Sequence, residues 1–287
     1  MLSVKLAVLL LVGLASAFGL AALYGASRWR AGTGELRARI AAAREAVAPA
    51  TYDPGRELGG LPAPVRRFFE AALRPGQPMI AAAHIPHEGT FNLGESRPSW
   101  KPFTSTEVVS IRRPGFDWDG KIAMAPGVSA RVHDAYVAGE GILEARLLGL
   151  VKLVELRGTA DLARGELMRY LAEAMWYPTA LLPSQGVSWE PIDDSSARAT
   201  LADGSTVVSL DFHFSADGLI ESTRAAARPR TVGGTVVATP WGGRGWRYER
   251  REGMRIPMAG EVAWLLPEGA YPYWRGRITG LRYEFAR

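Results

Sequence analysis

The apolar positions of this chain follow three patterns along its length. Between Leu6 and Ser27 lie 22 residues without a charged side chain. Between Asp161 and Pro183 apolar residues recur with the spacing of an amphipathic helix, and in most segments beyond Met79 they alternate with polar residues, as in half-buried strands. The pattern therefore predicts an apolar N-terminal helix followed by a body of strands with one central helix.

The central helix is predicted to have one apolar face. Five residues recur on that face at the i, i+3, i+4, i+7 and i+8 spacing, namely Leu167, Met168, Leu171, Ala174 and Met175. Asp161 is a suitable N-cap, and Pro178 is expected to end the helix because it restricts the backbone of Tyr177. One face of this helix should therefore be covered by the sheet.

The opposite stripe of this helix is polar and ends in an aromatic residue. Glu166, Arg169 and Glu173 have the three- and four-residue spacing that allows ion pairs, and Trp176 follows them. One interpretation is a solvated face whose pairs contribute roughly a few tenths of a kcal/mol each. The other is that Arg169 and Glu173 lie under the sheet in a hydrogen-bonded network or line a pocket, because Trp176 is poorly suited to a solvated face.

The N-terminal apolar segment is long enough to cross a bilayer. As a helix it would span about 30 Å of hydrocarbon, and Arg28-Trp29-Arg30 follows it in a pattern typical of an interface. The alternative is a signal peptide cleaved after Ala15-Ser16-Ala17, which would leave a secreted or periplasmic protein. Because the apolar run continues past that site to Leu23, the preferred interpretation is an uncleaved, single-pass membrane anchor.

The chain is expected to contain one folded domain behind its anchor. Residues 1–27 form the transmembrane anchor, residues 28–60 form a partly helical stalk or linker, and residues 61–287 form a single α+β domain. The linker assignment depends on a helix-prone stretch up to Ala48 and on turn-forming residues between Pro49 and Gly60. A short helix between Pro64 and Pro75 should open the domain.

Turn signals indicate that the strands form an antiparallel sheet. Asp203-Gly204 and Asp217-Gly218 separate three alternating segments, and Gly139-Glu140-Gly141 is a further hairpin signal. Two glycine pairs, Gly233-Gly234 and Gly242-Gly243, are also expected in turns.

Other strand positions predict how the sheet is shaped. In the strand 116–124 one face is apolar and the other, with Asp117 and Asp119, is expected to be wet. The apolar phase of the last strand changes near Gly280, where a bulge is predicted. The fold class is α+β: an N-terminal transmembrane helix, then a curved antiparallel sheet, partly closed as a half-barrel, packed on a central amphipathic helix.

Composition argues against several classes of protein. The net charge is +5, but 30 of the 34 basic residues are arginines that are scattered along the chain, so no nucleic-acid partner is expected. The chain has no cysteine, which excludes disulfides, thiol catalysis and cysteine metal sites.

Two groups of polar residues superficially suggest catalysis or metal binding. The segment from His84 to Glu88 contains two histidines and a carboxylate, but Pro86 prevents a helical metal motif, and a loop is expected. Ser209 and His213 lie on one strand face with Asp211 between them, and they would be about 13 Å apart, too far for a nucleophile and its base. No catalytic residue, metal site or cofactor is therefore predicted.

Several segments together resemble a known family. RYLAEAMWYPTALLP (169–183), VHDAYVAGEG (132–141), PWGG (240–243), EVAWLLPEG (261–269) and YWRGRITGLRYEF (273–285) resemble a bacterial, membrane-associated family of unknown function. The likeness covers roughly Leu61 to Arg287 and implies a bacterial source and frequent membrane association, without an assigned chemistry. The expected architecture is also similar to the half-barrel of periplasmic lipoprotein carriers, a likeness of fold alone.

The sequence supports three functional hypotheses. The first is a membrane-anchored, non-catalytic domain that binds a lipid or another apolar ligand in a groove between sheet and helix. Its expected ligand-binding residues are Arg169, Glu173, Trp176, Asp134, Trp264 and Trp274. The alternatives are an enzyme of unknown reaction that uses Asp134, Glu173 and Arg169, and an envelope interaction or sensor module.

The first hypothesis predicts an apolar cavity between helix and sheet, lined partly by tryptophans, with glycines 260, 276 and 280 supplying space and curvature. Trp176 would lie at its mouth, where an arginine could meet an anionic headgroup.

The side of the membrane that carries the body is a separate question. Arginines follow the apolar segment and only Lys5 precedes it, so the positive-inside rule alone predicts a cytoplasmic body. The short N-terminal tail and the similarity to periplasmic carriers favour the other orientation. We expect an extracytoplasmic body. The sequence does not predict an oligomeric state.

Overall fold

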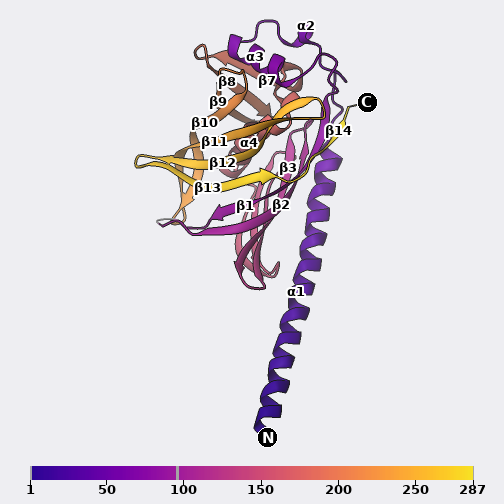
Figure 1. Ribbon diagram of the computed structural model, residues 1–287, viewed down its shortest axis with the longest axis vertical. Coiled ribbons are helices and arrows are strands. Elements are labelled where there is room, and N and C mark those ends of the chain that lie inside the picture. Colours follow the sequence, from indigo (N-terminus) through magenta and orange to yellow (C-terminus); the bar gives the residue numbers. More distant parts are fainter. Residues whose placement is uncertain (1, 95–96, 287) are drawn as a thin grey trace.

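In the computed structural model, which describes residues 2–94 and 97–286, fourteen strands form one antiparallel sheet that curves around a helix (Figure 1). The helices are α1 (Leu2–Ala43), α2 (Pro54–Glu57), α3 (Ala63–Ala72) and α4 (Ala160–Glu173). The strands of the first half are β1 (Ile80–Asn92), β2 (Trp100–Ser110), β3 (Gly115–Ala125), β4 (Val128–Val137), β5 (Glu140–Leu147) and β6 (Val151–Arg157). Those of the second half are β7 (Val187–Pro191), β8 (Ser196–Asp203), β9 (Thr206–Phe214), β10 (Ile220–Val232), β11 (Thr235–Arg251), β12 (Met254–Leu266), β13 (Gly269–Ile278) and β14 (Arg282–Phe285).

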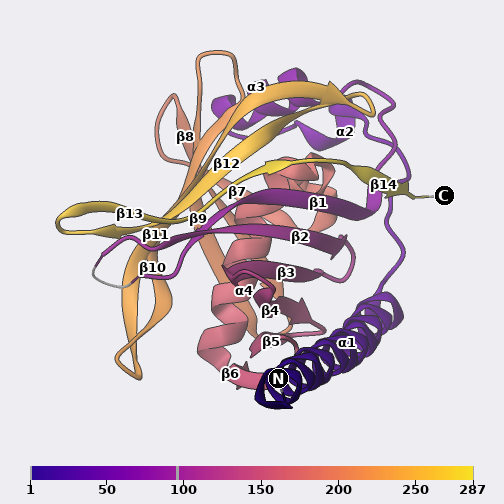
Figure 2. The ribbon, with the colours of Figure 1, turned by 60° about the horizontal axis from the view of Figure 1, so that its bottom comes forward.

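Two runs of consecutive hairpins build the sheet. The strand order is β6-β5-β4-β3-β2-β1-β13-β12-β11-β10-β9-β8-β7, and β14 also pairs with β1. The pairing of β1 with β13 joins the two runs, and all the pairs are antiparallel. Because each run curls to the same side, the sheet forms a half-barrel around α4 (Figure 2). The predicted α+β fold class is confirmed, as are the hairpins at Gly139, Gly204 and Gly218.

Helix α4 fills the concave side of the sheet. Its apolar face, with Leu167 and Leu171 fully buried, lies in the main hydrophobic core. The predicted N-cap at Asp161 is wrong: the side chain of Thr159 accepts from the amide of Leu162 and caps the helix. The α-helix also ends earlier than predicted, at Glu173, and a single 3-10 turn, Ala174–Trp176, continues it toward Pro178.

Helix α1 lies on the convex side of the sheet and extends far beyond it (Figure 1). It is one continuous helix, and residues 28–43, expected as part of a stalk, contact β2, β3 and β4. Before Tyr24 nearly all of its side chains are exposed, whereas Trp29, Leu36 and Ile40 are buried against the sheet. Trp29 is therefore a packing residue and not the interfacial residue that the sequence suggested.

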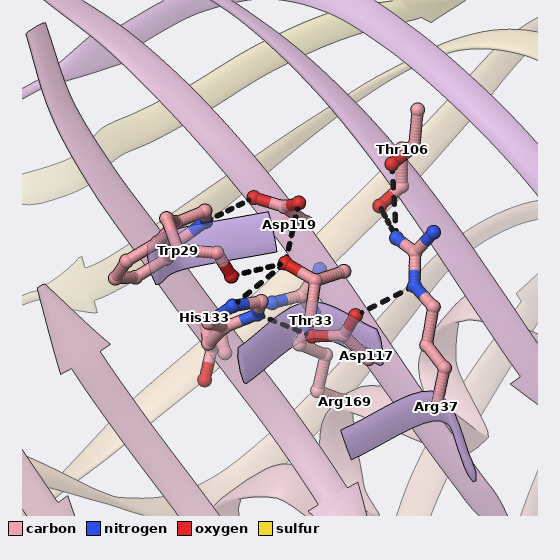
Figure 3. Close-up of polar contacts among 9 residues, drawn as sticks. Trp29, Thr33, Arg37, Thr106, Asp117, Asp119, His133 and Arg169 are labelled. Atoms are coloured by element: carbon pink, nitrogen blue, oxygen red, sulfur yellow. Dashed lines mark hydrogen bonds and ion pairs between the residues drawn. The ribbon is translucent and has the colours of Figure 1, made fainter. Parts of the chain in front are cut away.

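Polar side chains join α1 to the sheet (Figure 3). Trp29 donates from Nε1 to Asp119 Oδ1 at 2.8 Å, and its ring stacks on that of His133 at 4.3 Å. Arg37 Nε donates to Asp117 Oδ2 at 2.9 Å, and Asp117 Oδ1 lies 2.7 Å from His133 Nδ1. The wet face predicted for the strand 116–124 is wrong at Asp117, which α1 covers and which is fully buried, but Lys121 and Ala123 of the same face are exposed.

A row of glycines crosses the concave face where the end of α4 meets the sheet. Gly89, Gly276, Gly260 and Gly245 are register partners on β1, β13, β12 and β11. The rings of Trp176 and Trp274 lie over this row, and an added Cβ at Gly276 would stand 2.5 Å from the Trp274 ring. Glycines 260 and 276 therefore provide the space that the sequence analysis expected for tryptophans.

Two expectations about glycines are wrong. Gly242-Gly243 lies inside β11 rather than in a turn, where a Cβ on Gly242 would approach the carbonyl oxygen of Thr223 to 2.8 Å. Near Gly280 there is an interruption between β13 and β14 rather than a bulge. The interruption faces Pro86 of β1, which has no backbone N–H to continue the ladder.

The segment from His84 to Glu88 is also different from the prediction. It is part of β1 and not a loop. His84 Nε2 lies 2.8 Å from Glu284 Oε1 of β14, whereas His87 points into the core and is 2% exposed. The two histidines belong to different faces because their spacing is odd.

Candidate functional site

A cavity of about 240 Å³ lies between the sheet and α4. Its walls are mainly apolar and aromatic, and its polar lining consists of Arg169 and Glu173 from α4 with Asp134 from β4. The remaining lining residues are Phe91, Leu93, Trp118, Ile122, Val132, Leu143, Trp241, Val262, Tyr273 and Trp274. A concave, mainly apolar site with a few convergent polar groups is the usual form of a small-molecule site.

Arg169 is the centre of the polar end of the cavity. It donates from Nε to Glu173 Oε1 at 2.8 Å and from Nη1 to Asp134 Oδ2 at 2.6 Å. Its guanidinium also lies over the rings of Phe116, at 4.9 Å, and Trp118, at 5.5 Å. With only 13% of its side chain exposed, Arg169 belongs to a buried network, which settles the choice between the two interpretations of this stripe.

Glu107 from β2 is a further carboxyl group beside Arg169. Its Oε1 lies 3.6 Å from Arg169 Nη2, and the residue is 1% exposed. Burial, and then the charge of the neighbouring Glu173, raise the pKa of Glu107 well above its ordinary value. A neutral Glu107 is the form that this site favours.

A second buried pair extends the network on the other side. Arg228 from β10 donates from Nη2 to Glu166 Oε1 at 3.3 Å and from Nη1 to the hydroxyl of Tyr273 at 3.2 Å. The spacing in the sequence had suggested a pair between Glu166 and Arg169. In the structure Glu166 pairs with Arg228 instead. Burial, followed by the charge of Asp134, raises the pKa of Glu166.

Charge balance follows from these pKa directions. Four carboxyl groups, from Glu107, Asp134, Glu166 and Glu173, surround the guanidinium groups of Arg169 and Arg228. When Glu107 and Glu166 are protonated, two negative charges face two positive ones. The network is then neutral, which is the condition under which charged groups are tolerated in a protein interior.

His87 packs close to this network. Its ring lies 5.1 Å from that of Trp176 and 5.9 Å from that of Trp274. Burial, and then the positive charge of Arg169, lower the pKa of His87 to about 3. The imidazole is therefore neutral at physiological pH.

The six residues expected to bind a ligand do not all line the cavity. Asp134, Arg169, Glu173 and Trp274 do. Trp176 is 5% exposed and lines an adjoining void of about 30 Å³ that shares Glu173, Trp241 and Val262 with the cavity. Trp264 does not line the cavity, but its ring stacks on that of Tyr273, which does, with ring centroids 5.8 Å apart.

Sequence reasoning missed Glu107, Glu166 as a partner of Arg228, and His87. Glu107 is a charged residue next to apolar residues in its strand, and this neighbourhood was the available signal for a buried carboxyl group. Among residues 2–94 and 97–286, no cluster of three or more His, Asp or Glu side chains could hold a metal ion.

A larger depression of about 610 Å³ lies elsewhere on the surface. Its walls include Glu88, Arg277, Glu249 and Arg251, and these side chains already form ion pairs with one another. The cavity beside α4 is the better candidate because it is mainly apolar and contains buried polar groups.

The fold and the site define an α+β half-barrel with a cavity between its sheet and its helix. The chain belongs to a family of unknown function, DUF6920, whose model matches residues 59–283. A search of curated protein sequences finds no match to the chain.

Solved structures similar to this chain include a lipoprotein-sorting domain and a LolA superfamily protein. One is a candidate outer membrane lipoprotein-sorting protein domain from Vibrio parahaemolyticus, with a TM-score of 0.39 and 10% identity over 71% of this chain and 86% of that chain. Another is a LolA superfamily protein from Nitrosomonas europaea, with a TM-score of 0.31 and 13% identity over 77% of this chain and 93% of that chain. Both resemblances expected from the sequence, to a family of unknown function and to lipoprotein carriers, are confirmed as resemblances.

Proposed function

We propose that this protein is a membrane-anchored, non-catalytic domain that binds a lipid or another apolar ligand in the cavity between the sheet and α4. The observation that carries the proposal is the cavity itself, whose mainly apolar walls end in the polar group of Arg169, Asp134 and Glu173. Apolar walls would bind a hydrocarbon chain through the hydrophobic effect, and the polar end would orient it.

The membrane anchor in this proposal is the exposed half of α1. Among the described residues, one helix is long and apolar enough to cross a membrane, and its most apolar window has a mean hydropathy of 2.5 with no residue buried. A helix that is apolar on all sides and not covered by protein is suited to a lipid environment.

The polar end of the cavity favours a neutral group over an anionic one. The guanidinium of Arg169 is already paired with Asp134 and Glu173, so it has little to offer an anionic headgroup. Asp134 Oδ1 and Glu173 Oε2 are buried, and the protonated carboxyl groups of Glu166 and Glu107 can donate to Asp134 and Glu173. A neutral hydroxyl or amide would therefore be tolerated at this end better than a carboxylate, because a buried charge without a counter-charge costs far more than a neutral polar group.

The size of the cavity limits the ligand. Its volume of about 240 Å³ is below the roughly 300–1,000 Å³ of sites that enclose a drug-sized molecule. It would accept a short apolar molecule or part of one acyl chain, with the remainder of a longer lipid outside.

An enzyme that uses Asp134, Glu173 and Arg169 is the second candidate. General acid–base catalysis needs a carboxyl group with a shifted pKa within reach of the substrate. The two carboxyl groups whose pKa burial raises, those of Glu107 and Glu166, are not part of the cavity lining. This arrangement favours ligand binding over acid–base catalysis.

A titration of the purified full chain tests the binding proposal. Trp118, Trp241 and Trp274 line the cavity, so a long-chain alcohol should produce a saturable change in tryptophan emission. A fatty acid of equal length should bind more weakly, because its carboxylate would meet two carboxylates. Val132→Phe fills the cavity and should weaken binding at least about tenfold, whereas Val207→Phe on the exposed part of β9 should leave it unchanged.

The absence of a saturable change with either ligand would contradict the proposal, and so would equal binding by the Val132→Phe variant. Tighter binding of the fatty acid would reject only the preference for a neutral headgroup.

The orientation of the body stays a prediction. We propose that it lies on the extracytoplasmic side, attached through Leu6 to Ser27. A fluorescent reporter that folds only in the cytoplasm, fused after Arg287, should remain dark, and bright fluorescence would place the body in the cytoplasm.

A further inference from the structure

An exposed apolar strip continues the cavity wall onto the edge strand β6. Leu143 of β5 lines the cavity and faces the same way as Ala145 and Leu147, because alternate residues of a strand share a face. Their register partners on β6 are Leu156, Val154 and Val151, and a one-residue shift in the pairing between Ala145 and Arg146 keeps Val151 opposite Leu147. These three β6 side chains are 41%, 37% and 61% exposed, so the apolar surface extends from the cavity to the outside of the protein.

One end of this strip lies beside the apolar half of α1. The turn between β5 and β6 touches α1 at Gly25, where an added Cβ would stand 2.1 Å from the carbonyl oxygen of Leu148. An added Cβ at Gly149 would in turn stand 2.6 Å from the carbonyl oxygen of Gly25. Only glycine at position 25 allows this contact, which holds the turn at the point where the exposed apolar half of the helix ends.

The rest of β6 runs away from that point along α1. At the other end of β6, Arg157 Nε lies 3.6 Å from Glu140 Oε1. Arg39 Nη2 of α1 lies 2.7 Å from Oε2 of the same carboxyl group. Gly25 is two residues from Ser27, or about 3 Å along the helix axis, so the β5–β6 turn would lie at the membrane surface if Leu6 to Ser27 crosses the bilayer. Leu156 would lie about 16 Å further from it along the strand.

The polar contacts of α1 fix this geometry. Trp29 and Arg37 are bound to Asp119 and Asp117 of β3, so the helix cannot slide or turn on the sheet without breaking buried hydrogen bonds. The distance between the apolar segment and the β5–β6 turn is therefore a property of the folded protein and not of a flexible linker.

We propose that the β5–β6 turn docks on the bilayer and that the strip formed by Val151, Val154 and Leu156 guides a lipid acyl chain between the membrane and the cavity. This inference rests on the proposed function and adds the source of the ligand, which is the bilayer that holds α1. The exposed valines and leucine, which would be unfavourable in water, form a continuous apolar path from the headgroup region to Leu143.

The edge strand β6 could instead pair with a second copy of this chain. Charged side chains on β6 disfavour that choice, because Lys152, Glu155 and Arg157 would be brought against a neighbouring strand. A bilayer surface requires no such pairing and tolerates these charged groups at the headgroups.

Site-specific probes in the full chain test the docking. The chain contains no cysteine, so a polarity-sensitive fluorophore can be attached to one introduced residue at a time. The test positions are Val151→Cys and Leu156→Cys. The matched control is Val207→Cys on β9, whose side chain is 55% exposed. Leu14→Cys in the apolar half of α1 reports on anchoring itself. Each labelled protein is reconstituted into phosphatidylcholine vesicles with and without nitroxide-labelled lipid.

The expected result is a gradient of quenching. The probe at Val151 should lose about half of its emission, because interfacial groups lie within roughly 5–10 Å of the acyl boundary. The probe at Leu156 should lose less, and the probe at Val207 should be unaffected.

Quenching at Leu14 but not at Val151 would overturn the docking while leaving the anchor intact. No quenching at Leu14 would instead reject the anchor of the proposed function. A Val151 probe that is shielded only at high protein concentration, without lipid quenching, would identify a second copy as the occupant and overturn the proposal.

Discussion

Replacing Arg169 with methionine is expected to lower the free energy of unfolding by about 3–5 kcal/mol, the usual cost of removing one partner from a buried ion pair. The substitution would leave Asp134 and Glu173 without their counter-charge while both remain largely covered. Methionine keeps a flexible, unbranched stem of similar length to the aliphatic part of arginine, so most of the loss comes from the guanidinium group. Urea denaturation of the full chain in detergent, followed by tryptophan emission, measures the change.

Arg198→Met is the matched control. Arg198 makes a two-point contact with Asp211, at 2.7 Å and 3.2 Å, but 48% of its side chain is exposed. An exposed pair of this kind contributes roughly 0.2–1 kcal/mol. Equal shifts in the two variants would show that the Arg169 network is solvated, and the interpretation of the cavity end would have to change.

The second large effect concerns His87 and pH. The pKa of His87 is about 3 in the folded protein and has an ordinary value near 6.5 in the unfolded chain. Between these values the unfolded chain binds the proton and the folded protein does not. The contribution of His87 to stability is therefore complete above about pH 6.5 and is lost as the pH falls toward 3, by roughly 4 kcal/mol in total.

His87→Phe should remove this loss while retaining an aromatic ring between Trp176 and Trp274. Unfolding is measured for both proteins at several pH values between 7 and 3. The stability of the variant relative to the wild type should rise as the pH falls. Using the difference between two proteins cancels the opposite contribution of Glu107 and Glu166, whose protonation at low pH favours the folded state.

His213→Phe, at a half-buried position of β9, is the control for the change from histidine to phenylalanine. A constant difference between the His87→Phe variant and the wild type across this pH range would mean that water or a shifted backbone solvates His87. The conclusion that the core around Trp176 excludes water would then be wrong.

The polar network explains why the cavity could persist in a folded protein. Protein interiors normally close around apolar space because a void forfeits packing contacts. Here the glycine row at Gly260 and Gly276 leaves room for Trp176 and Trp274, and the paired charges at Arg169 prevent α4 from approaching the sheet more closely. Ion pairs thus form the polar end of the cavity, and mainly apolar and aromatic side chains form its walls.

Local signals in the sequence were enough to predict most of the elements. The hairpins at Gly204 and Gly218 follow from Asp-Gly turns, and α4 follows from its apolar periodicity, because both kinds of signal act within a few residues. The half-barrel could be inferred because many antiparallel strands with one helix have few ways to bury their apolar faces. Arg169, Asp134 and Trp274 were among the ligand-binding residues expected from the sequence, and all three line the cavity.

The partners of these residues could not be predicted in the same way. Arg169 and Asp134 are 35 residues apart, and Arg228 and Glu166 are 62 apart. Whether such groups meet depends on the curvature of the sheet and on the position of α4, and a shift of one residue in a strand would turn each side chain to the opposite face. The covering of Asp117 by α1 has the same origin. An alternating strand shows which side chains share a face, but the solvent exposure of that face is set by whatever packs against it. Here that is helix α1, whose Arg37 is 80 residues from Asp117 in the chain.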